Sequence, residues 1–505
     1  MRFNLFYISP ELILALGGML VLAVGLWARS GVTPASPRKL GVLSPEIVSL
    51  AVLIGALVPT VMLFGRAHVM RGLPQFFLGG MRSGMMAVDG LAVFFKIIAI
   101  LSTAIVIFLS MEYFKGLDFH RGEFYALLIF ATLAINMLAA STDLIMIYLS
   151  LEFLSITSYI LVGYLKKDPK SNEAAIKYFL YGSIAAAVML YGMSMLYGVT
   201  GTTNIFRIAD SLAANTGGIG IYHFMFVSLL LVLVGLGFKI AMVPFHHWAP
   251  DAYEGAPTPI TAFLSVGSKA AGFAVIVRVL ATSLRPDVLW WAPLVMILSG
   301  VTMTIGNLVA IPQTNIKRML AYSSIAQAGY ILLGVAAMPY TSIALTAVIL
   351  YIFIYLFMNL GAFTVVTLLS AKLRSDHLRE YAGLIRRAPV HAVALVVFLL
   401  SLAGIPPTAG FLAKFYLFLA AVNAQSNQIL WLAIIALANT VVSIYYYMNV
   451  ARLMFFRKPE SLEPIPQSRT LNFVLGLTLA MTFIILLYPK PFIRLAEMSA
   501  RVLSG

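Results

Sequence analysis

Apolar runs of roughly 20 residues recur along the whole chain, separated by short polar, basic or glycine- and proline-containing breaks. A run of this length crosses a bilayer as an α-helix, whereas the strands of a membrane barrel would alternate over about 10 residues. With 61% hydrophobic and 10% charged residues, the 505-residue chain differs strongly from a soluble domain. The sequence therefore predicts an all-α polytopic membrane protein.

Hydropathy predicts about fourteen transmembrane helices in a single membrane domain covering residues 1–505, because no loop is long enough for an independent domain. The first run lacks a clear cleavage site and is interpreted as a retained helix. The predicted spans are 10–28, 44–65, 89–111, 123–140, 143–163, 173–198, 222–247, 258–281, 288–311, 317–337, 342–371, 388–424, 427–453 and 470–488.

The net charge of +15 is better explained by topology than by nucleic-acid binding, because the chain has no dense Lys/Arg run. If the N-terminus faces outward, most loop lysines and arginines face the cytoplasm, as the positive-inside rule requires. We therefore expect a lipid bilayer around the chain, both termini on the outer side and no nucleic-acid partner. The chain has no cysteine, so it cannot ligate an iron–sulfur cluster through thiolates.

Four ionisable residues, Glu152, Lys239, Lys269 and Lys414, lie near the middle of different apolar runs. Each charge at that depth costs about 2.5–3.5 kcal/mol, which packing alone does not require. A nearby carboxylate stabilises the charged form of a buried lysine, so a Lys/Glu pair of variable distance can bind and release a proton. We expect Glu152 to be the counter-ion of Lys239, and Lys269 and Lys414 to be relay sites. The alternative is packed or snorkelling lysines, which mid-span depth disfavours.

Prolines interrupt the seventh and twelfth predicted spans. Pro244 follows Lys239, and the pair Pro406 and Pro407 precedes Lys414 while releasing two carbonyls, those of residues 402 and 403, from helical hydrogen bonds. Broken helices at corresponding places indicate inverted repeats with a site near the bilayer midplane. The alternative is a pair of ordinary proline kinks.

Further polar residues lie close to the first break. Glu173 and Lys177 have the i, i+4 spacing of a helix-surface ion pair. His246 follows Pro244 and could pass protons between neighbouring spans, although a single loop histidine is more often an ordinary polar residue. The carboxylates of Asp251 and the following loop are interpreted as solvated caps without a special role.

The most specific stretches resemble one known family, the N subunits of the proton-pumping NADH:quinone oxidoreductases (respiratory complex I), together with their photosynthetic B-type relatives. The resemblance runs through most of the chain. Its motifs are KKDPKSNEAAIKYFLYGS (166–183), GFKIAMVPFHHWAPDAYEGAPTPITAFLSVGSKAA (237–271), NIKRMLAYSSIAQAGY (315–330) and LAGIPPTAGFLAKFYLF (402–418).

The resemblance implies a fourteen-helix proton-translocating subunit with broken helices 7 and 12. Two inverted five-helix repeats, 123–281 and 288–453, would follow helices 1–3 (10–111) and precede helix 14 (470–488). Matched residue by residue, the motifs imply the following roles: Glu152 the fifth-helix glutamate, Lys239 its partner, Lys269 the central lysine, Lys414 the exit residue, and Glu173, Lys177 and His246 lesser positions. Lysine at 414 differs from the aspartate of subunit L and the glutamate of subunit M.

The same resemblance implies where the redox chemistry takes place. NADH, FMN, iron–sulfur clusters and quinone are expected in partner subunits and none of them in this chain, with subunit M and the small A-, J- and K-type subunits adjacent in a bacterial inner membrane. Two alternatives remain open from the sequence. The chain could be a subunit of a multisubunit Na⁺/H⁺ antiporter, or a structural scaffold that only holds its neighbours.

Overall fold

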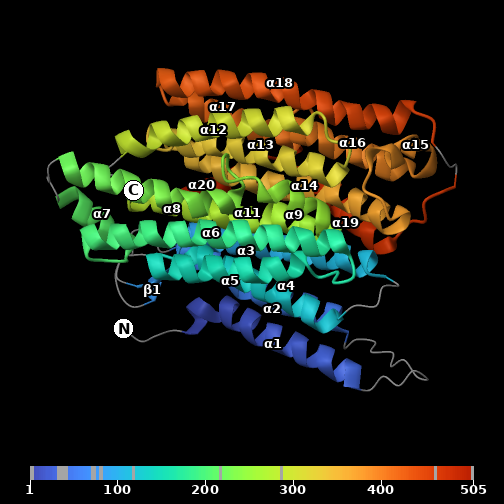
Figure 1. Ribbon diagram of the computed structural model, residues 1–505, viewed down its shortest axis with the longest axis horizontal. Coiled ribbons are helices and arrows are strands. Elements are labelled where there is room, and N and C mark those ends of the chain that lie inside the picture. The colour runs from blue at the N-terminus through green and yellow to red at the C-terminus, as the bar shows by residue number, and fades with distance from the viewer. Residues whose placement is uncertain are drawn as a thin grey trace.

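The computed structural model describes residues 5–30, 44–69, 76–78, 84–115, 120–214, 219–284, 288–459 and 463–501. Long helices run roughly side by side along the longest axis of the molecule (Figure 1). The first half of the chain contains η1 (Leu5–Ile8), α1 (Ser9–Ser30), α2 (Pro45–Val69), β1 (Phe76–Leu78), β2 (Met86–Val88), α3 (Gly90–Tyr113), α4 (Arg121–Ala140), α5 (Leu144–Val162), α6 (Pro169–Thr200), α7 (Ile205–Ala214), α8 (Ile219–Ile240) and α9 (Trp248–Gly255).

The second half continues with shorter segments around a few long helices. These are α10 (Thr258–Phe263), the π-helical turn η3 (Leu264–Ser268), α11 (Lys269–Thr282), α12 (Val288–Ala310), α13 (Ile316–Ala337), α14 (Ile343–Leu373), η5 (Leu378–Tyr381), α15 (Leu384–Arg387), α16 (Pro389–Ala403), α17 (Ala409–Asn423), α18 (Asn427–Phe456), α19 (Arg469–Leu487) and α20 (Lys490–Ala500).

Within the described residues, twelve helical segments are long and apolar enough to cross a bilayer. Three shorter apolar helices, Phe224–Ile240, α16 and α17, adjoin the interruptions of the chain. The predicted polytopic helical class is confirmed, while the number fourteen stays a prediction. The fold is not purely helical, because β1 and β2 form an antiparallel hairpin between α2 and α3. Hydropathy could not predict strands of three residues each.

Polar residues begin several of the long helices. Asp89 accepts a hydrogen bond from the backbone N–H of Ala92 at the start of α3, and Asp143 caps α5 in the same way. Asp168 caps α6, where Pro169 occupies the first turn. Short side chains of this kind satisfy N–H groups that have no partner inside the helix.

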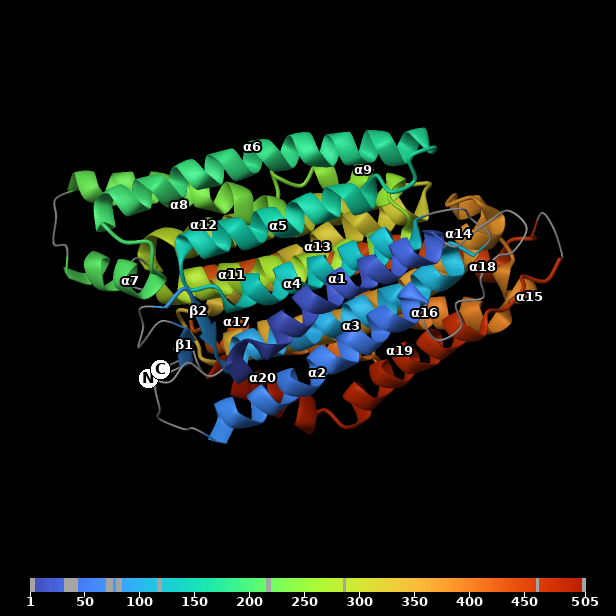
Figure 2. The same cartoon turned by 90° about the horizontal axis from the view of Figure 1, so that it is seen from below.

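Helix α14 is the continuous element at the centre of the bundle. Its 31 residues span about 46 Å at 1.5 Å per residue, and nearly all of them are buried. It packs against α3, α10, α13, α16, α17, α19 and α20, so segments from both halves of the chain meet on it. Figure 2 shows the same bundle from below, with β1, β2 and α7 at one end and α15 at the other.

The chain leaves helical geometry at two places. Helix α8 ends at Ile240, the Val243–Pro244 bond is cis, and α9 begins only at Trp248. Helix α16 ends at Ala403, the Pro406–Pro407 bond is cis, and α17 begins at Ala409. Gly404 closes α16 with φ of +83°, a left-handed conformation that glycine adopts without a steric penalty.

Candidate functional site

The three mid-span lysines are buried, and each ammonium group contacts a neutral polar atom. Lys239 Nζ lies 3.3 Å from Ser155 Oγ on α5. Lys269 Nζ donates to the backbone oxygen of Ser324 on α13 at 2.7 Å. Lys239 is 0% exposed and Lys269 and Lys414 are 4% exposed, so none of the three side chains snorkels to the surface.

Glu152 lies on the same helix as the hydroxyl that binds Lys239. It precedes Ser155 by three residues, which places both side chains on one face of α5. No ion pair within 4 Å joins Glu152 to Lys239 among the described residues, and Glu152 Oε1 is buried without a hydrogen-bond partner there. Glu152 therefore lies close to the hydroxyl partner of Lys239 without a direct contact to its ammonium group, and its role as the counter-ion of Lys239 stays a prediction.

The surroundings of Lys269 contain hydroxyl and amide groups and a small cavity. Lys269, Ser324, Gln327 and Tyr355 line this cavity together with apolar residues of α11, α13 and α14. Tyr355 donates a hydrogen bond to Ser324 Oγ at 3.0 Å. The π-helical turn directly precedes Lys269, and such turns often occur at functional sites. Neither the turn nor the cavity could be predicted from the sequence.

The second break uses its released carbonyls to bind two polar side chains. Gln327 Nε2 donates to the oxygen of Leu402 at 2.9 Å, and Lys414 Nζ donates to the oxygen of Ala403 at 2.9 Å. Lys414 also contacts Thr440 Oγ1 at 3.3 Å and lies 4.2 Å from the ring centre of Tyr330. The break thus supplies acceptors that an intact helix would have used internally.

Gln327 lies between the surroundings of Lys269 and those of Lys414. It lines the cavity beside Lys269 and binds Leu402, the neighbour of the residue that holds Lys414. It also accepts a hydrogen bond from Tyr351 and contacts the hydroxyl of Tyr447. Polar groups therefore continue from one buried amine toward the next.

The first break carries His246, which is 7% exposed. Its ring centre lies 4.4 Å from that of His247, and its Nδ1 is buried without a hydrogen-bond partner in the described part of the chain. Trp248 donates its indole N–H to the oxygen of Phe238 at 2.8 Å. Trp248, which follows the two histidines, is thereby held to the carbonyl of the residue that precedes Lys239.

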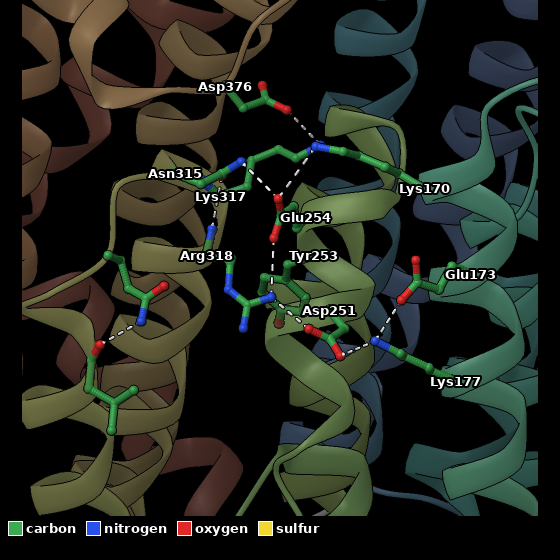
Figure 3. Close-up of polar contacts among 12 residues, drawn as sticks. Lys170, Glu173, Lys177, Asp251, Tyr253, Glu254, Asn315, Lys317, Arg318 and Asp376 are labelled. Atoms are coloured by element: carbon green, nitrogen blue, oxygen red, sulfur yellow. Dashed lines mark hydrogen bonds and ion pairs between the residues drawn. The ribbon is translucent and has the colours of Figure 1, made fainter.

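A network of charges joins α6, α9 and α13 (Figure 3). Lys177 pairs with Glu173 at 2.8 Å and with Asp251 Oδ2 at 3.0 Å. Arg318 pairs with Asp251 Oδ1 at 2.6 Å and with Glu254 Oε2 at 3.1 Å. Asp251 and Glu254 were interpreted from the sequence as solvated caps, but each binds cations of other helices. The interpretation as solvated caps without a special role was wrong. The sequence could not reveal these partners, because they lie more than 60 residues away along the chain.

Electrostatics explain why Asp251 stays charged. Burial alone would raise the pKa of its carboxyl, but the hydrogen bonds from Arg318 and Lys177 outweigh burial and lower that pKa from the ordinary value of 3.8. A carboxylate with two cationic donors favours its ionised form. Asp251 is therefore a fixed anion in this network.

The described residues contain no group of three or more His, Asp or Glu side chains arranged to hold a metal ion. What the site offers instead is a set of buried amines, hydroxyls and amides. The amines can bind and release protons, and the hydroxyls and amides can donate and accept hydrogen bonds.

Comparison with known proteins identifies the family that shares these features. A family model described as "NADH:quinone oxidoreductase/Mrp antiporter, TM" matches residues 141–443. The NADH-quinone oxidoreductase subunit N of Desulforamulus reducens is 41% identical over 501 residues, which cover 99% of each chain. The chain belongs to the NADH-quinone oxidoreductase subunit N family.

Solved structures place the subunit N family within a wider fold. Respiratory complex I from Thermus thermophilus contains a chain that is 30% identical, with a TM-score of 0.76 and coverage of 97% of this chain and 99% of that one. A chain of the Mrp complex from Dietzia sp. DQ12-45-1b has a TM-score of 0.82 at 22% identity, covering 99% and 97% of the two chains. The likeness to the Mrp complex therefore extends to the fold alone.

Two buried ion pairs of this subunit N family member could not be read from the sequence. Arg278 of α11 forms a bidentate pair with Asp89 at 2.7 and 2.9 Å. Lys96 of α3 pairs with Glu11 of α1 at 2.6 Å. The acids lie near predicted span boundaries, where solvated caps are common, so only the tertiary contacts reveal their partners.

Proposed function

We propose that this chain conducts protons across the membrane as a subunit of an NADH–quinone oxidoreductase, driven by quinone reduction in partner subunits. The membership in the subunit N family supports the assembly, and the buried amines support the chemistry. The observation that carries the proposal is that Lys239, Lys269 and Lys414 are all buried and bound to hydroxyl or carbonyl oxygens instead of carboxylates.

The proposed transfer begins at Lys239. Glu152, close to this lysine, stabilises its ammonium form, and a change of charge or distance at Glu152 weakens that effect. The proton then moves to Lys269 and, through the polar groups around Gln327, to Lys414. His246, Glu173 and Lys177 are proposed to assist at the entrance. NADH, FMN, iron–sulfur clusters and quinone belong to partner subunits in this proposal, since a cysteine-free chain cannot supply thiolate ligands.

The architecture that we propose for this function contains fourteen spans, two inverted five-helix repeats and two broken helices. The interruptions after Ile240 and Ala403 support it, because each lies close to a buried lysine. We further propose a bacterial inner membrane, both termini on the outer side, and subunit M and the small A-, J- and K-type subunits as neighbours.

Lys269→Ala tests the central step. We expect it to abolish or strongly reduce proton pumping in the assembled complex, because it removes the amine between Lys239 and Lys414. NADH-driven acidification of inverted membrane vesicles, normalised to NADH oxidation, measures the effect. Lys167→Ala, which changes an exposed lysine between α5 and α6, is the matched control. Unchanged protons per electron in Lys269→Ala would reject the role.

A multisubunit Na⁺/H⁺ antiporter is the second candidate, since the Mrp complex shares the fold. Mass spectrometry of the proteins that purify with the chain separates the two candidates. NADH- and quinone-reactive subunits support the oxidoreductase, and antiporter subunits support the second candidate. A purely structural scaffold would retain normal pumping when Glu152, Lys239, Lys269 and Lys414 are all changed to alanine.

A further inference from the structure

Helix α9 lies directly after the first break and fits closely between α6 and α13. Its last residue, Gly255, has no room for a side chain, since a Cβ there would collide with the backbone oxygen of Lys170 and lie 2.5 Å from Ala174 Cβ. At the other end, the Trp248 ring stacks on Tyr178 of α6 with 4.3 Å between ring centres. Both ends of α9 are therefore in contact with α6.

Charges attach the same short helix to α13. The two oxygens of Asp251 bind different helices, Oδ1 contacting Arg318 of α13 and Oδ2 contacting Lys177 of α6. Lys317, the neighbour of Arg318, donates to the backbone oxygen of Ala256 at 2.9 Å, immediately after α9. Asp251 thus binds both flanking helices (Figure 3), and Glu254 adds a longer contact to Lys170 of α6 at 3.8 Å beside its pair with Arg318.

The contacts of α9 reach the residue before Lys239 at one end and, through α13, the acceptor of Lys269 at the other. Trp248 at the start of α9 holds the carbonyl of Phe238, the residue before Lys239. Helix α13 carries Ser324, whose carbonyl holds Lys269. Because helices are stiff over the six residues from Arg318 to Ser324, α9 links the position of Lys239 to that of the acceptor of Lys269.

The charges of this connection are too exposed to serve mainly as a source of stability. The side chains of Lys177, Asp251 and Arg318 are 42%, 29% and 30% exposed. Ion pairs this open to water contribute little to folding. Their distinctive property is geometric, because bonds to two helices fix where α9 lies.

We propose that Asp251 is a positioning residue, which holds α9 between α6 and α13 and thereby sets the separation of Lys239 and Lys269 for proton transfer. The inference rests on the proposed function. Both carboxylate oxygens are occupied by cations, so Asp251 acts through geometry and does not carry the proton itself. Proton transfer depends steeply on geometry, and a displacement of about 1 Å can cost two orders of magnitude in rate.

Substitution of Asp251 by asparagine tests this role without creating an unpaired cation. In Asp251→Asn, Lys177 keeps Glu173 and Arg318 keeps Glu254, so the helix is expected to stay folded. We expect NADH-driven pumping per assembled complex to fall by about threefold or more. Asp251→Glu should restore most of the loss, because its carboxylate can reach both cations. Asp210→Asn is the matched control, since it makes the same change at an exposed aspartate of another helix, α7.

A double variant sharpens the test. Arg318→Met should slow pumping as well, and Asp251→Asn combined with Arg318→Met should be no slower than the slower single variant, because both remove the same contact. Wild-type pumping in Asp251→Asn would overturn the positioning role, and so would a loss that only matches a lower amount of subunit in the purified complex. Lys269→Ala, measured in parallel, distinguishes the two proposals. If it pumps normally, the proposed function fails, whereas blocked Lys269→Ala with normal Asp251→Asn rejects the positioning role alone.

Discussion

At the scale of single residues, the buried lysines share one arrangement. Their ammonium groups donate to Ser155, Ser324 and Ala403, all neutral acceptors. A neutral oxygen stabilises the charged amine less than a carboxylate would, so a proton on such an amine is easier to release. The arrangement suits groups that exchange protons better than groups that only hold helices together.

Asp251 gives a prediction about pH. Its lowered pKa means that the carboxylate, together with its bonds to Lys177 and Arg318, is present above the ordinary value of 3.8 and is lost only as the pH falls below it. The ratio of Asp251→Asn to wild-type pumping should therefore be constant between about pH 6 and about pH 8. Vesicle acidification at several pH values, with Asp210→Asn as control, measures this ratio. A ratio that approaches one toward pH 6 would contradict the prediction.

The sequence predicts which charged residues lie deep within apolar runs better than it predicts which residues bind one another in the fold. Lys239, Lys269 and Lys414 were found because a charge amid apolar residues stands out, and their burial agrees with that prediction. Asp251 did not stand out, because an acid at a span boundary needs no special explanation. Its significance comes from Lys177 and Arg318, which only the fold brings to it.

At the scale of secondary structure, backbone carbonyls near the two interruptions accept hydrogen bonds from side chains. At the second break the carbonyls of Leu402 and Ala403 bind Gln327 and Lys414. The sequence predicted the release of these carbonyls from the position of the prolines. It could not predict their partners, nor the π-helical turn before Lys269, since neither depends on local sequence alone.

Gly404 offers a test of the second break. Gly404→Ala would place a side chain at a φ of +83°, which costs roughly 1–2 kcal/mol, with its Cβ 2.6 Å from Lys414 Cδ. We expect Lys414 to be displaced from Ala403 and pumping to fall, while the complex still assembles. Gly476→Ala is the control, because a Cβ at Gly476 meets no atom within 4 Å. Equal pumping in the two variants would argue against a role for this geometry.

At the scale of the whole molecule, a buried ion pair joins the N-terminal helices to the first group of broken segments. Asp89 begins α3, and Arg278 lies on α11, 189 residues later. Both side chains are 1% exposed, and Arg278 Nη2 also donates to the oxygen of Ala139. The polytopic helical class could be predicted from hydropathy, but a contact at this separation could not.

Removing one member of this pair should destabilise the protein. Asp89→Ala leaves a buried arginine without its carboxylate, which costs about 3–5 kcal/mol. We expect less assembled subunit and a lower melting temperature of the purified complex. Lys115→Ala is the control, since Lys115 is 73% exposed and its distance to Glu112 is 3.9 Å. Wild-type melting of Asp89→Ala would show that the pair is dispensable.

Helix α14 remains uninterrupted although the helices that carry the buried amines are broken. It contacts α10 and η3 on the Lys269 side and α16 and α17 on the Lys414 side. The segments on both sides of the two breaks therefore pack against one uninterrupted helix. A local rearrangement at either lysine can leave this shared helix in place, so both halves of the chain keep a common packing surface.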